Sequence, residues 1–201
     1  AKNVLAWARL AELQMSLGDL DHALDAALYA VNLNPRLSKT QTLLGFAHLL
    51  QIDIQTAKDN FYHAIALDQA DPMPRLGLGL ALIREGNLED GRIELEIAAS
   101  LDPGNSLIRS YLGKAYFEEK RYSLSSTQFE LAKERDPKDP TPWFYDAIQK
   151  QTQNRPVEAL WDIQKSIELN NNRAVYRSKF LLDRDEAARG SSLARIFENL
   201  G

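Results

Sequence analysis

The side chains that could do chemistry in this chain of 201 residues are few and widely scattered. The sequence has three histidines, His22, His48 and His63, and no cysteine. The histidines lack the spacing that ligands show in zinc sites, and a chain without cysteine has neither a thiol nucleophile nor a disulfide. The sequence therefore predicts no metal site, and we interpret His48 as a hydrogen-bonded residue of the fold.

The acidic and glycine-rich motifs also give no specific indication of catalysis or of phosphate binding. Glu118-Glu119 and the run at 183–186 are typical of solvated helix faces and connectors. Gly77 and Gly79 resemble a phosphate-binding loop only in their glycines, because no strand pattern precedes them and no Lys-Ser or Lys-Thr follows. The sequence therefore predicts a protein that is not an enzyme, with no catalytic residue and no cofactor.

The composition and net charge bear on two further functions, nucleic-acid binding and membrane insertion. Hydrophobic residues make up 44% of the chain and charged residues 26%, which is typical of a folded domain. The net charge of −4 gives no general attraction to nucleic acid, and no apolar run approaches the ~20 residues that span a bilayer. We therefore expect neither nucleic-acid binding nor direct insertion of this chain into a membrane.

A Leu-Gly pair recurs along the chain at a constant interval of 34 positions. It occurs at Leu44-Gly45, Leu78-Gly79 and Leu112-Gly113, and small residues recur at the same interval at Ala23, Ala57, Gly91, Ser125 and Ala159. A glycine within a helix costs about 1 kcal/mol relative to alanine, so three at one repeat position predict a close approach between helices. A period of this length is typical of an array of structural repeats.

Each interval contains two amphipathic helices, because its apolar residues recur at spacings of three and four. Pairs such as Asp102-Pro103 and Asp136-Pro137 end the second helix, and Pro72 and Pro140 suit the first turn of a new helix. The predicted helix pairs are 4–16 with 20–33, 38–50 with 54–67, 72–84 with 88–101, 106–119 with 122–135, and 140–153 with 156–169. We expect no strand, and hence an all-α fold.

The repeating unit resembles the tetratricopeptide repeat, a helix–turn–helix of about 34 residues. The fourth repeat carries the motif residues Leu112, Gly113, Tyr116, Phe129, Ala132 and Pro137, whereas Gln14, His48, Leu82 and Lys150 stand in other repeats where the family prefers Tyr. The resemblance implies a right-handed α-α superhelix of five repeats, at about 4–37, 38–71, 72–105, 106–139 and 140–173. It also implies a scaffold for protein–protein interaction.

The regular interval breaks after the fifth repeat. Residues 174–183 predict an extra helix, and residues 187–201 resemble the first helix of a further repeat that is truncated. An array needs a cap for its last apolar face, so we expect this chain to be a fragment of a larger protein. Residues 136–201 also resemble the repeat region of large bacterial proteins that carry an outer-membrane β-barrel. That resemblance implies a secretion or cell-surface protein in the periplasm, with a cytoplasmic location as the alternative.

The resemblance further implies which side chains line the concave face of the superhelix, because the inner positions of the family's first helices can be carried over to this sequence. Many are apolar, and a helix that is apolar on nearly all faces, such as 38–50, is normally buried. We predict a groove for a helix or an extended peptide, with Arg84 and Lys114 supplying charge at its rim. The predicted lining is Phe46, Leu49, Leu50, Met73, Leu76, Leu80, Ile83, Arg84, Lys114, Phe117, Phe144 and Ile148.

Other interpretations of these side chains stay open from the sequence alone. Packing between repeats would bury about half of them, or the extra helix at 174–183 would fold back into the groove. The apolar surface would alternatively serve self-association and produce a homo-oligomer. Recognition of a polysaccharide during export is a weaker alternative, because sugar sites favour exposed aromatic side chains and this groove is aliphatic.

Overall fold

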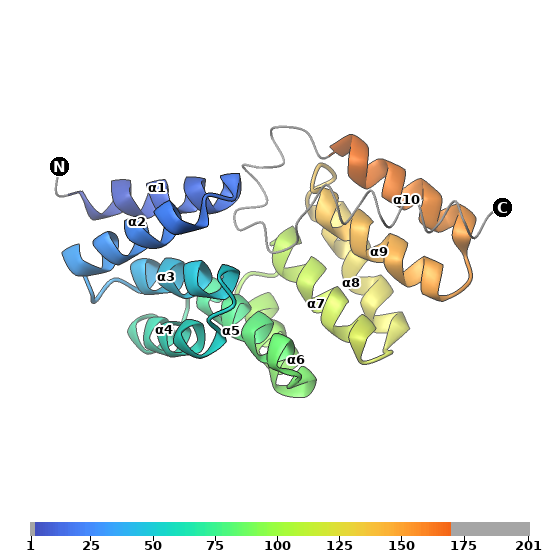
Figure 1. Ribbon diagram of the computed structural model, residues 1–201. Helices are drawn as coiled ribbons and strands as arrows, with labels where there is room; N and C mark the ends of the chain where they lie inside the picture. Colours follow the sequence, from blue (N-terminus) through green and yellow to red (C-terminus); the bar gives the residue numbers. More distant parts are fainter. Residues whose placement is uncertain (1–2, 170–201) are drawn as a thin grey trace. The chain divides into compact units, whose positions relative to one another are not determined.

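The computed structural model describes residues 3–169, which form ten α-helices and no strand (Figure 1). The helices are α1 (Val4–Leu17), α2 (Leu20–Leu33), α3 (Ser38–Leu50), α4 (Ile54–Leu67), α5 (Pro72–Glu85), α6 (Leu88–Leu101), α7 (Ser106–Glu118), α8 (Tyr122–Arg135), α9 (Pro140–Thr152) and α10 (Pro156–Leu169). The ten helices predicted between residues 4 and 169 are therefore confirmed to within one residue at either end. The extra helix predicted at 174–183 and the truncated repeat predicted at 187–201 lie outside the described residues.

The described residues divide into two compact units, which we treat separately. The first unit ends at Asp102 and contains α1–α6, and the second begins at Pro103 and contains α7–α10. In the first unit α3 packs against α1 and α2, and α5 packs against α3 and α4. In the second unit α9 packs against α7 and α8 in the same way. The prediction of an all-α fold made of stacked helix pairs is therefore confirmed.

The turn inside every helix pair has the same backbone geometry. One residue directly after the first helix, or one position later, adopts a left-handed conformation with φ between 58° and 96°. These residues are Gly18, Ile52, Gly86, Lys120 and Asn154, which lie 34 positions apart. The amide of the next residue then donates to a carbonyl five positions earlier, for example Asp53 N to His48 O at 3.0 Å, as in helix ends of the Schellman type. The sequence period is therefore also a period of the backbone.

The recurring glycines lie where the two helices of a pair come close together. A Cβ atom on Gly45 or on Gly113 would lie 2.6 Å from a ring atom of Phe61 or Phe129, respectively. A Cβ atom on Gly79 would lie 2.8 Å from the backbone oxygen of Gly91. All three contacts join the first helix of a pair to the second, so the predicted close approach is confirmed.

Candidate functional site

The first helices of the first unit, α1, α3 and α5, lie side by side (Figure 1). Residues 34 positions apart occupy equivalent places on these helices and form rows across them. We define the first-helix face of the first unit as four such rows of three. They are Leu5, Lys39 and Met73; Ala8, Thr42 and Leu76; Glu12, Phe46 and Leu80; and Ser16, Leu50 and Arg84.

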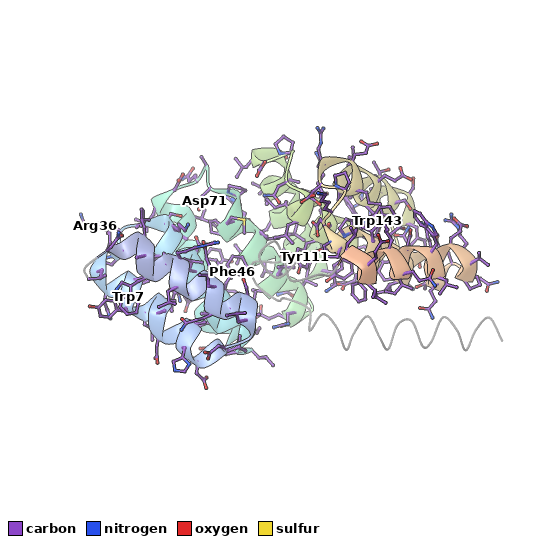
Figure 2. All side chains as sticks on the ribbon, turned by 90° about the horizontal axis from the view of Figure 1, so that it is seen from above. Trp7, Arg36, Phe46, Asp71, Tyr111 and Trp143 are labelled. Atoms are coloured by element: carbon purple, nitrogen blue, oxygen red, sulfur yellow. The ribbon has the colours of Figure 1, made fainter. Side chains whose placement is uncertain are left out.

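The predicted groove residues of the first unit fall into a buried set and an accessible set. Phe46 and Leu76 are 0% exposed and Leu49 is 1% exposed. The Phe46 ring, labelled on α3 in Figure 2, meets the Phe61 ring edge-on at 5.0 Å between centroids, so these side chains belong to the core. The accessible set consists of Leu50, Met73, Leu80 and Ile83, which are half-buried, and Arg84, which is exposed.

The charges on the first-helix face are distributed unevenly. Glu12 is buried, and its carboxylate pairs with Arg9 Nη1 at 2.8 Å and with Lys39 Nζ at 3.2 Å. Arg84 donates from Nη1 to the backbone oxygen of Leu49 at 2.9 Å, at the C-terminal end of α3. Within the described residues, no carboxylate lies in ion-pair distance of Arg84. The face therefore combines half-buried apolar side chains with one guanidinium that is bound to a backbone carbonyl.

The four predicted groove residues of the second unit have a more polar and aromatic environment. The ammonium of Lys114 lies 5.3 Å from the centroid of the Tyr145 ring and 3.8 Å from Glu118. Phe117 is half-buried with its ring 6.0 Å from that of Tyr122. Phe144 is buried and Ile148 is half-buried. In this unit the accessible predicted residues are therefore Lys114, Phe117 and Ile148.

Comparison with known proteins gives one consistent answer about the fold. No family model matches the sequence, and no curated protein matches it. Among solved structures, the chain is similar to TTC0263, a tetratricopeptide-repeat protein of Thermus thermophilus, with a TM-score of 0.79 and 19% identity over 96% of this chain and 100% of that one. The chain has the tetratricopeptide-repeat fold.

Two further tetratricopeptide-fold structures resemble the chain at lower scores. PilF of Pseudomonas aeruginosa has a TM-score of 0.68 and 16% identity, over 97% of this chain and 90% of that one. YrrB, described as a tetratricopeptide-repeat protein with an unusual peptide-binding site, has a TM-score of 0.55 and 18% identity, over 89% of this chain and 92% of that one. At these identities the likeness concerns the fold.

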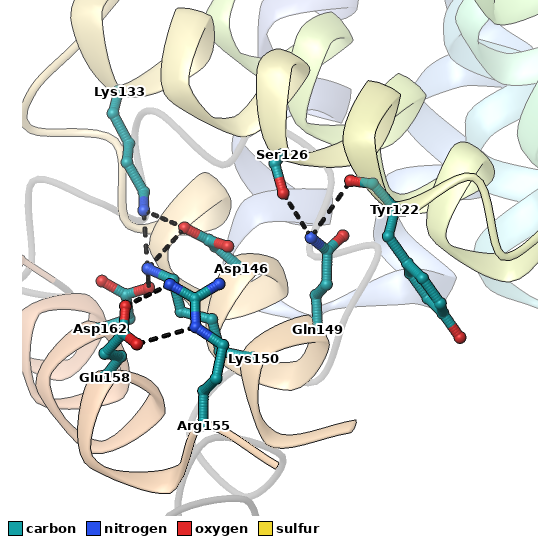
Figure 3. Close-up of polar contacts among 9 residues, drawn as sticks. All are labelled: Tyr122, Ser126, Lys133, Asp146, Gln149, Lys150, Arg155, Glu158 and Asp162. Atoms are coloured by element: carbon teal, nitrogen blue, oxygen red, sulfur yellow. Dashed lines mark hydrogen bonds and ion pairs between the residues drawn. The ribbon is translucent and has the colours of Figure 1, made fainter. Parts of the chain in front are cut away.

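A cluster of two buried carboxylates and two half-buried lysines, which the sequence reasoning missed, joins the last three tetratricopeptide helices that the structure describes. We call it the charge quartet: Lys133 from α8, Asp146 and Lys150 from α9, and Asp162 from α10 (Figure 3). Lys133 Nζ lies 2.5 Å from Asp146 Oδ2, and Lys150 Nζ lies 2.5 Å from Asp162 Oδ2. The crossed pairs are longer, with Lys150 at 3.0 Å from Asp146 and Lys133 at 3.6 Å from Asp162.

The two carboxylates of the charge quartet have different electrostatic environments. Burial raises the pKa of Asp162, whose side chain is 0% exposed and whose Oδ1 has no hydrogen-bond partner among the described residues. Burial also opposes the charge of Asp146, but the ammonium groups of Lys133 and Lys150 outweigh it and lower the pKa of that carboxyl. For Lys150, burial is outweighed by the bonds to Asp162 and Asp146, so its pKa is raised. The ion pairs therefore favour the charged form of Asp146 more than that of Asp162.

One signal in the sequence pointed toward this cluster. Lys150 stands where this fold usually has a Tyr and where the third repeat has Leu82, so a charge occupies a position otherwise used for packing. Next to the quartet, the ammonium of Lys133 lies 4.2 Å from the centroid of the Trp143 ring. Trp143 in turn meets Trp161 edge-on at 5.3 Å, and Trp161 is 59% exposed.

Two of the three histidines, His22 and His48, have local partners. His48 Nδ1 lies 3.2 Å from Asp53 Oδ2, which agrees with its interpretation as a hydrogen-bonded residue of the fold. His22 Nδ1 lies 2.8 Å from Asp19, and the hydrogen bond to that carboxylate raises the pKa of His22. Across residues 3–169, no three His, Asp or Glu side chains are grouped so as to hold a metal ion. None of the ten described helices is both long and apolar enough to cross a membrane.

Proposed function

We propose that this chain is a non-catalytic scaffold that binds a protein or peptide segment through the first-helix face of its first unit. The observation that carries the proposal is the group of partly exposed apolar side chains on neighbouring first helices. Leu50 on α3 lies one row from Leu80 on α5, and Met73 is a third half-buried apolar residue of the face. Ile83 lies outside the four rows, with its side chain near Gly91 of α6. Apolar side chains gathered on one surface are typical of interaction sites. Lys114, Phe117 and Ile148 stay candidates for a binding surface on the second unit.

The charged residues support binding rather than catalysis. Arg75 pairs with Glu94 at 2.7 Å and Lys58 pairs with Glu85 at 2.7 Å, both within the first unit. The buried charges of the second unit neutralise one another in the charge quartet. Side chains that are held in such pairs stabilise and orient helices, whereas an acid–base catalyst needs a group within reach of a substrate.

The nature of the partner is supported by the fold and by the sequence resemblance. YrrB, which shares the fold, has a peptide-binding site according to its description, and we infer a protein or peptide partner here too. The resemblance of residues 136–201 to repeat regions of large bacterial proteins supports a role in secretion or at the cell surface, on the periplasmic side. Upstream and downstream sequence from the natural gene would test this setting.

The proposed face can be tested before the natural partner is identified. Dodecamer peptides would be selected from a phage-displayed random library on the full chain, and the affinity of the best binders measured by fluorescence anisotropy. Replacing Leu50 and Leu80 together by Glu should abolish binding, because two charges would enter the apolar surface. The matched control is Ile93→Glu, which adds a charge at a residue of α6 that is 41% exposed.

Circular dichroism would confirm that each variant keeps its helices. Loss of peptide binding in the double variant alone, with unchanged helicity, is the expected result. Failure to select any peptide, or equal affinity of the double variant and the wild type, would overturn the proposed function.

A further inference from the structure

We propose that the segment bound by the first-helix face of the first unit carries a carboxylate beside its apolar residues, and that Arg84 binds this carboxylate. The inference rests on the proposed function, because it names the chemistry of the partner at that same face. It follows from the balance of charges on the face, from the position of the Arg84 guanidinium and from a comparison with the other repeats.

The first step is the charge balance of the face. Of its twelve residues, only Glu12, Lys39 and Arg84 carry a charge. Glu12 is neutralised by Lys39 at 3.2 Å, with Arg9 at 2.8 Å on its other oxygen. No carboxylate among the described residues pairs with Arg84. The positive charge of Arg84 is therefore not balanced on this face. A partner of opposite charge would complement the face, and charge complementarity sets the specificity of an interface.

The second step is the position of the guanidinium. The hydrogen bond from Nη1 to Leu49 O, 2.9 Å long, holds the Arg84 side chain at the end of α3, beside Leu50. Leu80 precedes Arg84 by one turn of α5, so the two side chains lie on one side of that helix. A guanidinium has five N–H donors, and Leu49 accepts from one of them. The exposed donors are therefore fixed next to apolar side chains, in an arrangement that suits a bidentate bond to a carboxylate.

The third step concerns the alternative that Arg84 only stabilises the C-terminal end of α3. A cation at a helix C-terminus has such an effect. The equivalent positions of the other repeats, however, are Ser16, Leu50, Glu118 and Thr152, and none of them carries a cation. The first helices of the other pairs end in the same left-handed turn although they have no arginine at this position. A helix end in this fold therefore does not require an arginine, and the exception at Arg84 needs another reason.

The experiment compares peptide selection on the wild type and on Arg84→Glu, using the same phage-displayed library of dodecamers. Binders of the wild type should be enriched in Asp and Glu among apolar residues, and binders of Arg84→Glu should lose that enrichment and gain Lys or Arg. Arg36→Glu is the matched control, because Arg36 is an exposed arginine in the turn between α2 and α3 (Figure 2). Its binders should keep the acidic enrichment.

Synthetic peptides then measure the size of the effect. A selected peptide with its acidic residue changed to the matching amide, Glu to Gln or Asp to Asn, should bind the wild type about threefold to tenfold more weakly. In Arg84→Gln, which keeps a hydrogen-bond donor for Leu49 O, the two peptides should bind equally. Circular dichroism and thermal unfolding of both variants separate this result from loss of the fold, and Arg84→Gln serves if Arg84→Glu does not fold.

The outcomes for the two proposals are distinguishable. Selected peptides that lack acidic residues, or an acidic preference that survives in Arg84→Gln, would overturn the role of Arg84 and leave the proposed binding face standing. A role confined to the end of α3 would lower the unfolding temperature of Arg84→Gln without changing the peptide preference. If no peptide were selected on the wild type, the proposed function would fail together with this inference.

Discussion

In the first unit, Leu78 and Leu82 of α5 are buried apolar side chains, whereas the positions 68 places later in the second unit carry Asp146 and Lys150. Ile65 of α4 corresponds in the same way to Lys133 of α8. Three positions of the charge quartet thus carry apolar side chains in the first unit, whereas the fourth, Asp162, corresponds to Glu94, which pairs with Arg75. The comparison indicates that these positions do not determine how the helices pair.

The close helix contacts are what the two units share. Phe61 fits against Gly45 in the first unit and Phe129 fits against Gly113 in the second, and the distances are nearly the same. The small residue and the ring set the spacing between helices, and the side chains at the variable positions fill the space that remains. Buried ion pairs and well-packed apolar residues of similar volume are often close in stability, which explains why both solutions fold.

The largest effect should come from removing one member of the charge quartet. Asp146→Asn leaves Lys133 and Lys150 with a single carboxylate, so we expect it to lower the free energy of unfolding by about 3 kcal/mol. Asp162→Asn should cost less, because burial raises the pKa of Asp162 and the fold favours its charge less. Urea unfolding followed by circular dichroism measures both, and a greater loss for Asp162→Asn would contradict the assignment.

A second prediction compares the glycine contact of the first unit with its counterpart in the second. Gly79→Ala should destabilise the protein by about 2 kcal/mol although alanine favours helix, because its Cβ would meet the backbone oxygen of Gly91. In the second unit the fourth repeat has Gly113 at the equivalent position, whereas the fifth has Ala147 and therefore tolerates a Cβ there. Thermal unfolding would test this, and a stabilised Gly79→Ala variant would contradict the close-contact explanation.

A third prediction concerns the turns inside the helix pairs. Ile52 has a φ of 68° and is 72% exposed, so a β-branched side chain occupies a left-handed position and buries little surface. Ile52→Gly should stabilise the protein by about 1 kcal/mol. The corresponding change in the second unit, Lys120→Gly, should gain less because lysine is not β-branched. Equal gains in the two variants would argue against strain at Ile52.

The smallest predicted effect is a change in pH dependence. The pKa of Asp146 is lowered in the folded state, so its stabilising charge is present above about pH 4 and is lost as the pH falls through the lowered value. The pKa of Asp162 is raised, so its protonation favours the folded state as the pH falls and partly offsets that loss. Asp162→Asn should therefore lose more stability than the wild type between pH 7 and pH 3. Parallel urea titrations that give equal losses would contradict it.

The sequence predicted the helices well because each repeat contains its own boundary signals. Pro72 and Pro140 begin helices, polar residues such as Asp102 end them, and the recurring glycines mark the close contacts. These are local properties, and they recur at a constant interval along the chain. Fold class and helix ends could therefore be predicted from the chain alone.

The distribution of the candidate site residues between core and surface was harder to predict. Helical periodicity places Phe46, Leu49 and Leu76 on neighbouring faces of the first helices, but it does not state how much of each face a neighbouring helix covers. The charge quartet joins three helices. Asp146 and Lys150 are four residues apart on α9, but Lys133 and Asp162 come from α8 and α10 and are brought to them only by helix packing. Lys150 alone signalled a charge at a packing position.

The central claim is that the first-helix face of the first unit is the surface that contacts a peptide. Photo-crosslinking tests it most directly, with p-benzoylphenylalanine placed at Leu80 of α5 or, as the control, at Ile93 of α6. We predict that the protein labelled at position 80 forms a covalent adduct with a selected peptide under ultraviolet light and that the protein labelled at position 93 does not. An adduct at position 93 with none at position 80, from variants that bind the peptide equally, would contradict the account.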